Sequence, residues 1–298
     1  EPDRDPVRLT LTLIDEELRR EGNRRLVELE PGRWWLGDED EIAAARPPLS
    51  DRLEWAVYSL LSTSDGITEA SFFDRIASMF RGYDAPDEEI GRACLESQGV
   101  RDPGPDGLLR ALDPLRARHE EHGILVGRIA ELGHRLGMRV WISRREQRRL
   151  FRGRPLGELL TEAEARAYLP LVHPGPPEVL DATDCIWYIR GRLTFLFEVE
   201  WTAILDETVI RRGARIPTTD ALVRFLVVPP ERADLVRLKL ERSPLLRRRL
   251  AEDNWHIVKS DHLGRLLDRD DARLEDLGPI LGLDPEVERE GGQLALFE

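Results

Sequence analysis

The sequence predicts an α/β protein in which an N-terminal region of helices and a hairpin precedes a mixed central β-sheet flanked by helices. Apolar residues recur at helical spacing in several segments before residue 100. After a Pro- and Gly-rich stretch at 101–107, helical segments alternate with short runs rich in aromatic and β-branched residues. One such run, 222–228, is almost continuously apolar, which indicates a strand that a sheet buries on both faces.

The first residues predict one helix and one hairpin. A helix is expected over 14–20, and the runs 25–29 and 33–36 flank a Pro-Gly pair that is typical of a turn. A helix followed by a hairpin resembles the end of a winged-helix unit. We therefore expect a partial winged-helix-like unit over residues 1–46.

Three short helices are predicted next. Thr68 and Asp87 have side chains that cap the second and third of them. Helices in this order resemble a winged-helix domain, here expected over 47–103. The third helix would read DNA in such a domain, but it starts with three acidic residues that would repel phosphates, so packing or homodimer formation is the favoured role. The three helices are expected over 49–61, 69–79 and 88–96.

The second half of the chain predicts the central sheet, within a domain over 108–275. A long amphipathic helix precedes the first strand, and two later strands are joined by an Arg-Gly-Arg turn. The strands are expected over 139–143, 182–188, 194–201, 222–228 and 255–258. The helices are expected over 115–136, 202–212, 231–240, 244–250 and 262–267.

Composition sets limits on the class of protein. The 298 residues are enough for two domains, and 41% hydrophobic residues support a globular core. No apolar run approaches the length of a membrane span, and no signal-peptide pattern is visible, so we expect a cytoplasmic protein without membrane contact. Cys94 and Cys185 lie far apart and are expected to be buried thiols in a reducing compartment. Because the chain starts without Met inside a charged stretch, further domains upstream are expected.

Charge is spread unevenly along the chain. A net charge of −13 argues against a uniformly basic surface for nucleic acid, but arginines crowd two segments, 139–154 and 211–215. These clusters fit either phosphate binding or solvated helix faces that pair with acids. Lysine is nearly absent, and no glycine precedes a lysine as a P-loop requires, which argues against ATP hydrolysis. The arginines expected to bind nucleic acid are Arg145, Arg148, Arg149, Arg211 and Arg212.

The segment 184–200, D-C-I-W-Y-I-R-G-R-L-T-F-L-F-E-V-E, carries the clearest chemical signal. It predicts a strand that begins with an acid, a turn, and a second strand that ends in two acids. Strand alternation puts Glu198 and Glu200 on one face, which a buried strand tolerates only with a compensating charge. Carboxylates from two neighbouring strands suit Mg²⁺ or Mn²⁺, ions that are used to hydrolyse phosphodiesters.

These residues resemble the D…(D/E)-x-K signature of the restriction-endonuclease-like (PD-(D/E)XK) nucleases. Glu200 stands where that signature usually has lysine, and some type II restriction endonucleases carry the same E-x-E variant. The resemblance covers roughly residues 115–270. It implies that Asp184 and Glu198, with the backbone carbonyl of Val199, hold the metal, while Glu200 takes a proton from water or binds a second ion.

The same resemblance implies one more acid from the helix before the first strand. Glu121 is the preferred residue because it extends the apolar stripe of that helix, and Glu120 and Glu131 are the alternatives. His119 and His122 have a spacing that could bind a metal, but no other Cys/His group accompanies them. A solvated helix turn is therefore the favoured interpretation of the two histidines.

The end of the chain contains a different motif. Gln293, Leu294, Leu296 and Phe297, within the expected flexible tail 276–298, resemble the Q-L-x-L-F peptide by which bacterial repair and replication proteins bind the sliding clamp. Exposed apolar anchors on a flexible tail suit a preformed groove. The alternative is a tail that packs on its own domain.

Together these observations predict a bacterial DNA-processing protein. The favoured function is a metal-dependent nuclease that hydrolyses phosphodiester bonds, with DNA as the expected substrate, in repair, defence or processing, and the sequence does not distinguish DNA from RNA. The alternative is a catalytically inactive module of the same fold that binds nucleic acid or a protein partner as an adaptor.

Overall fold

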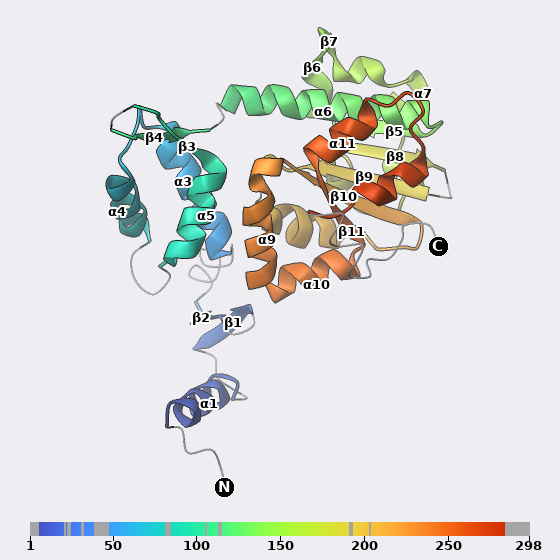
Figure 1. Ribbon diagram of the computed structural model, residues 1–298. Helices are drawn as coiled ribbons and strands as arrows, with labels where there is room; N and C mark the ends of the chain where they lie inside the picture. The colour runs from blue at the N-terminus through green and yellow to red at the C-terminus, as the bar shows by residue number, and fades with distance from the viewer. Residues whose placement is uncertain are drawn as a thin grey trace. The chain divides into compact units, whose positions relative to one another are not determined.

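The computed structural model divides the chain into two compact units, Glu1–Leu49 and Ser50–Glu298 (Figure 1). None of the described helices is long and apolar enough to cross a membrane. The structure describes residues 6–20, 22, 25–30, 33–38, 48–80, 85–104, 106–112, 115–190, 193–202 and 204–283.

The first unit contains the predicted helix and hairpin. Helix α1 (Pro6–Leu18) is longer than expected and begins earlier. Strands β1 (Leu26–Glu30) and β2 (Arg33–Leu36) pair antiparallel, as expected for a hairpin. The Pro31-Gly32 turn itself lies outside the described residues.

The second unit begins with the three predicted helices. They are α3 (Leu49–Ser62), α4 (Glu69–Met79) and α5 (Glu88–Gln98). The expected caps are present, because the Thr68 hydroxyl accepts a hydrogen bond from the backbone N–H of Ser71 and the Asp87 carboxylate accepts one from that of Ile90.

A short hairpin that the sequence did not predict follows the three helices. Strands β3 (Gly99–Arg101) and β4 (Leu109–Ala111) pair antiparallel, and Leu109 also bridges to Ile67. The Pro- and Gly-rich stretch 101–107 therefore runs between two paired strands. The three helices lie in the predicted order, and the winged-helix-like domain stays a prediction.

A mixed five-stranded sheet is the centre of the rest of the unit, which confirms the predicted α/β class. Its strand order is β11-β10-β9-β8-β5, with β5, β8 and β9 antiparallel and β9, β10 and β11 parallel. The strands are β5 (Arg139–Ile142), β8 (Cys185–Ile189), β9 (Leu193–Val199), β10 (Leu222–Val228) and β11 (Trp255–Lys259).

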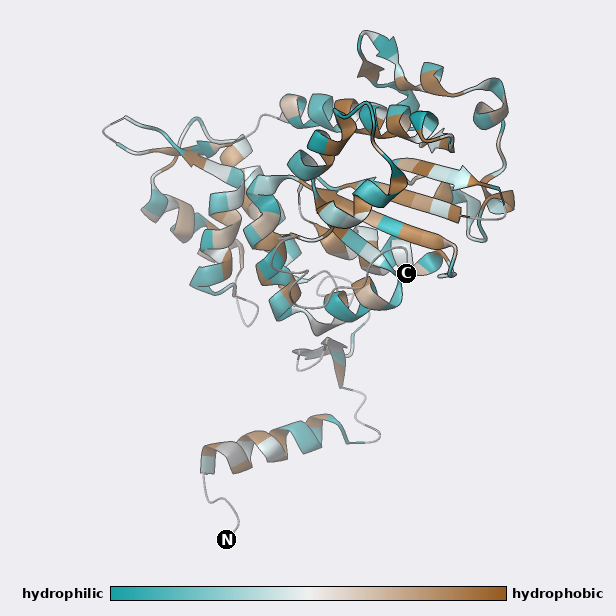
Figure 2. Cartoon of the chain, turned by 45° about the vertical axis from the view of Figure 1, so that its right-hand side comes forward, coloured by the Kyte–Doolittle hydropathy of each residue, from teal (hydrophilic) through white to brown (hydrophobic). Residues whose placement is uncertain are grey.

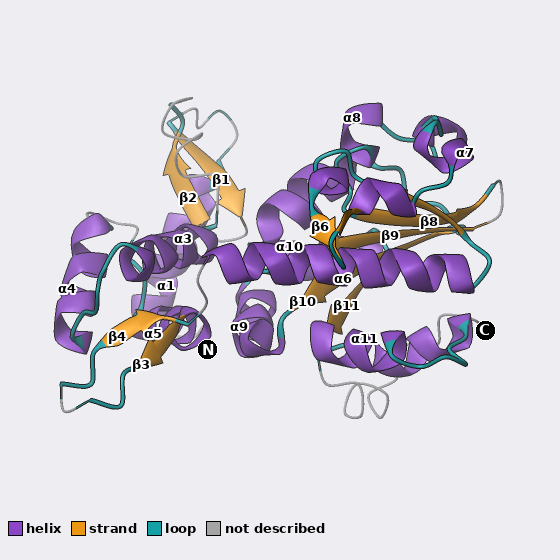
Figure 3. Cartoon of the chain, turned by 90° about the horizontal axis from the view of Figure 1, so that it is seen from above, coloured by secondary structure: helices purple, strands orange, loops and turns teal. Residues whose placement is uncertain are grey.

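Helices cover both faces of this sheet. Helices α6 (Leu115–Arg135) and α11 (Ser260–Leu267) pack on the face that carries Phe195, Phe197 and Phe225, and α6 lies in front of the sheet in Figure 3. The opposite face is covered by short elements and by two helices after β10. Figure 2 shows hydrophobic residues along the strands between these layers. The helices on the second face include α9 (Ala233–Arg242) and α10 (Pro244–Glu252).

Close packing fixes α6 against β8. A Cβ atom on Gly133 would lie 2.6 Å from the indole nitrogen of Trp187, so a larger residue at position 133 would push the two elements apart. The same indole N–H donates a hydrogen bond of 3.1 Å to the carbonyl of Ile129. The helix that precedes the sheet is thereby held in one position relative to the strands that carry the acids.

Two stretches differ from the sequence prediction. The expected helix 202–212 is a π-helix, η4 (Asp206–Arg212), followed by η5 (Gly213–Arg215). The stretch between β5 and β8, for which nothing was predicted, folds into short elements. These are η1 (Glu146–Arg148), β6 (Leu150–Phe151), β7 (Arg154–Pro155), η2 (Leu156–Leu159), α7 (Glu162–Ala165), η3 (Leu169–Leu171) and α8 (Pro177–Leu180).

The remaining elements are short, and both cysteines are buried. Elements η6 (Pro230–Arg232) and η7 (Leu274–Ile280) flank the helices of the second half. Cys94 and Cys185 are free, buried thiols, as expected, and burial raises the pKa of both.

Candidate active site

The two strands of the 184–200 segment bring Asp184 and Glu198 together. Because Cys185 pairs with Phe197 in the antiparallel register, the residues one step further, Asp184 and Glu198, lie opposite each other where β8 begins and β9 ends. They are only 3% and 7% exposed. Glu200 follows two residues later and is half-buried. The structure thus places all three predicted acids at one end of the sheet.

Three groups of the protein contact the carboxylate of Asp184. Oδ2 accepts a hydrogen bond of 2.9 Å from the backbone N–H of Val199 and lies 3.2 Å from Nε2 of His122. Oδ1 accepts one of 3.2 Å from Arg145. Burial acts to raise the pKa of Asp184, but these contacts outweigh it and hold the pKa below the usual range.

The surroundings of Glu198 shift its pKa in the opposite direction to that of Asp184. Burial, and then the negative charge of Asp184, raise the pKa of Glu198 to about 8. Two cations partly offset this: Arg212, whose Nη2 lies 3.4 Å from Oε2 of Glu198, and then Arg145. The two facing carboxylates therefore have pKa values displaced in opposite directions.

Glu200 is oriented by threonine side chains. Its Oε1 accepts hydrogen bonds from the backbone N–H and the hydroxyl of Thr202, at 3.1 and 2.5 Å, and its Oε2 lies 3.4 Å from the hydroxyl of Thr208. Burial raises the pKa of Glu200. This carboxylate is thus fixed in direction while its affinity for a proton is increased.

A second group of charged residues meets Asp184 from α6 and η1. Nδ1 of His122 lies 3.2 Å from Oε2 of Glu146, a fully buried acid. Arg145 and Arg149 also contact Glu146, at 3.0 and 2.5 Å. Burial acts to lower the pKa of His122, but Asp184 and Glu146 outweigh it and raise that pKa to about 9, so the imidazole is positively charged at neutral pH.

The position of His122 corrects one expectation from the sequence. Its side chain is 11% exposed and contacts two buried acids, whereas a solvated helix turn was expected. His119, three residues earlier, is exposed as that interpretation requires. Sequence reasoning also missed Glu146. The apolar stripe of α6 extends to both Glu121 and His122, so it narrows the choice to these two residues without deciding between them.

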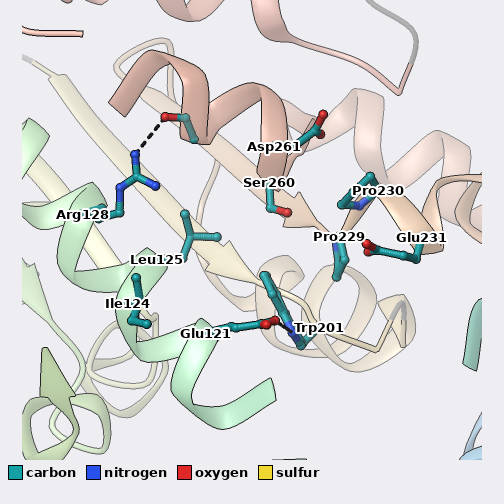
Figure 4. Close-up of a pocket in the computed structure, with 11 residues that line it drawn as sticks. Glu121, Ile124, Leu125, Arg128, Trp201, Pro229, Pro230, Glu231, Ser260 and Asp261 are labelled. Atoms are coloured by element: carbon teal, nitrogen blue, oxygen red, sulfur yellow. Dashed lines mark hydrogen bonds between the residues drawn. The ribbon is translucent and has the colours of Figure 1, made fainter. Parts of the chain in front are cut away.

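The helix acids lie away from the carboxylate pair. Glu121 was expected on the buried stripe of α6 but is exposed, and it accepts a hydrogen bond of 3.2 Å from the indole of Trp201. Figure 4 shows this contact in a separate pocket of about 360 Å³, which Arg128 and Asp261 also line. The lining of this pocket does not include the carboxylate pair.

The two alternative acids on the same helix form surface ion pairs. Glu120 lies 2.8 Å from Arg116, and Glu131 lies 2.8 Å from Arg152. Neither of these acids lines the pocket of the carboxylate pair among the residues that the structure describes. The α6 residue that contacts Asp184 is therefore a histidine.

The carboxylates open into a pocket of about 330 Å³ that also contains arginines. Arg145, Arg149 and Arg212, three of the five arginines expected to bind nucleic acid, line it together with the acids. Arg148 instead lines a neighbouring groove, and Arg211 is exposed at the end of η4. The predicted arginines thus divide into an inner set beside the acids and an outer set.

Two sets of donors could bind a metal ion. His122, Glu146 and Asp184 place one ligand atom each within 4.8 Å of one another. In that set the histidine is protonated and therefore donates hydrogen bonds. The oxygen set of Asp184 and Glu198 fits a divalent cation better, because a cation would offset the burial and the negative charge of Asp184 that raise the pKa of Glu198, and because Mg²⁺ and Mn²⁺ prefer oxygen ligands.

Comparison with known protein families identifies one match. Residues 110–247 match the family described as type II restriction enzyme NmeDI C-terminal domain. The matched range contains both groups of charged residues and every strand of the sheet except β11. This similarity supports a nuclease-related function and DNA as a partner.

Other comparisons add nothing to this similarity. No curated protein and no solved structure matches the chain significantly. The residues of the expected clamp-binding motif, Gln293, Leu294, Leu296 and Phe297, lie outside the described part of the chain.

Proposed function

We propose that this protein is a metal-dependent nuclease that hydrolyses phosphodiester bonds in DNA. The observation that carries the proposal is the buried pair of Asp184 and Glu198, which lie opposite each other at the ends of β8 and β9 and open into a pocket with four arginines. The similarity of residues 110–247 to a restriction-enzyme domain supports it. Repair, defence and other DNA processing in the bacterial cytoplasm remain the predicted settings.

Mg²⁺ or Mn²⁺ is the proposed cofactor. Asp184, Glu198 and the backbone carbonyl of Val199 would hold it. When bound, such an ion polarises phosphoryl oxygens and lowers the pKa of bound water. The backbone N–H of Val199 already donates to Asp184, which keeps the carboxylate and the neighbouring peptide group in a fixed relation.

Glu200 is proposed to take a proton from the attacking water. Three hydrogen bonds from Thr202 and Thr208 fix its direction, and burial raises its pKa toward the range in which a carboxylate works as a general base. Glu200 has no positive charge to offer. Arg212, which contacts Glu198, is the nearest candidate for stabilising charge on the phosphate.

The arginines are proposed to bind the phosphate backbone. Arg145 and Arg149 line the pocket beside the acids, and a guanidinium can donate two hydrogen bonds to one phosphate. Arg148 and Arg211 would contact the backbone further from the bond that is cut. Their solvent-exposed side chains fit this outer role.

A cleavage assay tests the proposal. Purified protein should cut DNA in Mg²⁺ or Mn²⁺, and Glu198→Ala should remove the activity without unfolding the protein. Glu162→Ala, which removes an exposed acid of α7, is the matched control and should cut like the wild type. Failure of the wild type to cut single-stranded, duplex and branched DNA, and also RNA, would refute the proposal.

One observation favours an inactive adaptor as the second candidate. Both oxygens of Asp184 already accept hydrogen bonds from the protein, from Val199, His122 and Arg145. A carboxylate whose oxygens already accept hydrogen bonds from the protein gains less stabilisation from a bound metal ion. The adaptor would bind DNA or a protein partner through the same pocket, and the cleavage assay above separates the two candidates.

Two further partners are proposed from the sequence alone. The Q-L-A-L-F residues 293–297 are proposed to bind the bacterial sliding clamp, because they combine apolar anchors in the order that clamp-binding peptides use. The helical region 47–103 is proposed to support a homodimer rather than to read bases.

A further inference from the structure

The pocket that holds the carboxylates has an aromatic wall from α3. Trp55 and Tyr58 line this pocket together with Asp184 and Glu198. Trp55 is 56% exposed, and its ring meets that of Tyr58 edge to face, with 6.1 Å between the centroids. An exposed indole beside a polar site is unusual, because indoles are normally buried for their large apolar area.

A cation lies behind the aromatic pair. The guanidinium of Arg118, on α6, lies over the ring of Tyr58 at 4.8 Å from its centroid. Arg118 is almost fully buried and donates a hydrogen bond of 2.6 Å to the side chain of Gln98 on α5. The aromatic wall is thus joined to the helix whose residues reach Asp184.

Buried charges hold α3 in place. Nζ of Lys239, on α9, lies 2.6 Å from the carboxylates of both Asp51 and Glu54. Gln98 donates a hydrogen bond of 2.7 Å to Glu54. All four side chains are buried, so α3 is fixed to the helices around the sheet, and Trp55, directly after Glu54, is presented from a rigid element.

A cationic groove leads away from this pocket. His119 and Arg149 line both the carboxylate pocket and a second groove, whose other residues are two arginines, one acid and one leucine: Arg116, Arg148, Glu120 and Leu150. A strand bound with its phosphates along this groove would enter the pocket that the carboxylates and Trp55 line. Aromatic rings combined with a cationic groove are the features by which proteins hold single strands of nucleic acid.

We propose that Trp55, supported by Tyr58, stacks on an unpaired base next to the phosphate that is cut. The substrate strand is therefore single-stranded, or locally unpaired, at the site. A base inside a duplex has both faces covered by its neighbours and offers none to an indole, so a paired substrate would leave Trp55 in water. This inference rests on the proposed nuclease function for the position of the cut.

Binding without metal tests the inference independently of cleavage. Fluorescence anisotropy of labelled oligothymidylate and of a labelled blunt duplex is measured in EDTA. Trp55→Ala should weaken binding of oligothymidylate about tenfold or more, the scale of one lost base–aromatic stack, and leave duplex binding unchanged. Trp55→Phe should retain most of the affinity. Tyr168→Ala, at a comparably exposed aromatic residue that does not line the pocket, should change neither.

A second readout reports stacking directly. 2-Aminopurine placed in the oligothymidylate loses fluorescence when it stacks, so the wild type should quench it and Trp55→Ala should not. No binding of oligothymidylate by the wild type, or equal losses for single strand and duplex in Trp55→Ala, would overturn the inference.

The outcomes also separate the inference from the proposed function. Trp55-dependent binding without cleavage by the wild type would support the aromatic wall as a strand-binding site and refute the nuclease. Metal-dependent cutting within intact duplex at the same rate in Trp55→Ala and wild type would support the nuclease and refute the inference.

Discussion

Neutralising Glu198 should stabilise the metal-free protein. Glu198→Gln keeps the shape of the side chain and removes the charge that burial and Asp184 disfavour. The long contact of 3.4 Å to Arg212 is the main interaction that the change weakens. The balance between these two effects decides whether the change stabilises or destabilises the protein. The raised pKa shows that the buried charge destabilises the folded state more than the contact with Arg212 stabilises it.

The size of the effect follows from the pKa. The pKa of Glu198 rises from a usual value of 4.5 to about 8 in the folded protein, so the folded state holds the proton more tightly and ionisation opposes folding. Stability of the wild type is therefore lost as the pH rises from 4.5 through 8. At about 1.4 kcal/mol per pKa unit, the penalty reaches about 3 kcal/mol at pH 7.

Chemical denaturation in EDTA at several pH values measures this penalty. Glu198→Gln should be more stable than the wild type by about 3 kcal/mol at pH 7, and the difference should vanish near pH 4.5. Added Mg²⁺ should then stabilise the wild type more than the variant, because a ligand that binds only the folded state adds stability. Glu162→Gln, at an exposed acid, should show no such pH dependence.

A loss of stability in Glu198→Gln at pH 7 would refute this reasoning. It would mean that Glu198 is ionised and held by Arg212 as a structural ion pair. Asp184→Asn provides the contrast. The pKa of Asp184 is lowered, so its charge contributes stability above the usual pKa that is lost as the pH falls, and neutralising it should destabilise the protein at pH 7.

Two further predictions concern the anchor of α3 and the tail. Lys239→Met should lower the free energy of unfolding by about 3 to 5 kcal/mol, because Asp51 and Glu54 stay buried without their cation. Denaturation curves measure this, and an unchanged midpoint would contradict the anchor. A peptide of residues 291–298 should bind bacterial sliding clamp with roughly micromolar affinity by calorimetry, and Phe297→Ala should abolish it. Absence of binding heat, with a lowered melting temperature of the Phe297→Ala protein, would instead show a tail docked on its own domain.

The sequence was sufficient to locate the acids of the central strands. Alternation of side chains along 194–200 puts Glu198 and Glu200 on one face, and a short turn between two apolar runs sets the register that brings Asp184 to them. These inferences need only local geometry. The strand boundaries differ from prediction by one to three residues, which leaves this pairing unchanged.

The charged residues around Asp184 could not be predicted in the same way. Glu121 and His122 differ by one position, about 100° around a helix, and both lie within one turn of the apolar residue Leu125. Packing of α6 on the sheet selects His122. Glu146 lies in a stretch of two- to four-residue elements, which are too short for any hydrophobic period to show.

Contacts between parts of the chain that are distant in sequence could not be predicted either. Lys239 contacts Asp51 and Glu54, which lie 188 and 185 residues earlier in the chain. No pattern in the sequence of α3 or α9 predicts that these two helices are in contact. The sequence also does not predict that Trp55 shares a pocket with the acids, because only folding brings α3 beside α6.

The central claim is that Asp184 and Glu198 bind a divalent cation at the end of the sheet. Crystals of the protein soaked in Mn²⁺, with diffraction collected to reveal the anomalous signal of manganese, test it most directly. We predict an anomalous peak within bonding distance of both carboxylates in the wild type and its loss in Glu198→Gln. A wild-type structure at saturating Mn²⁺ without that peak, or with the peak unchanged in the variant, would contradict the account.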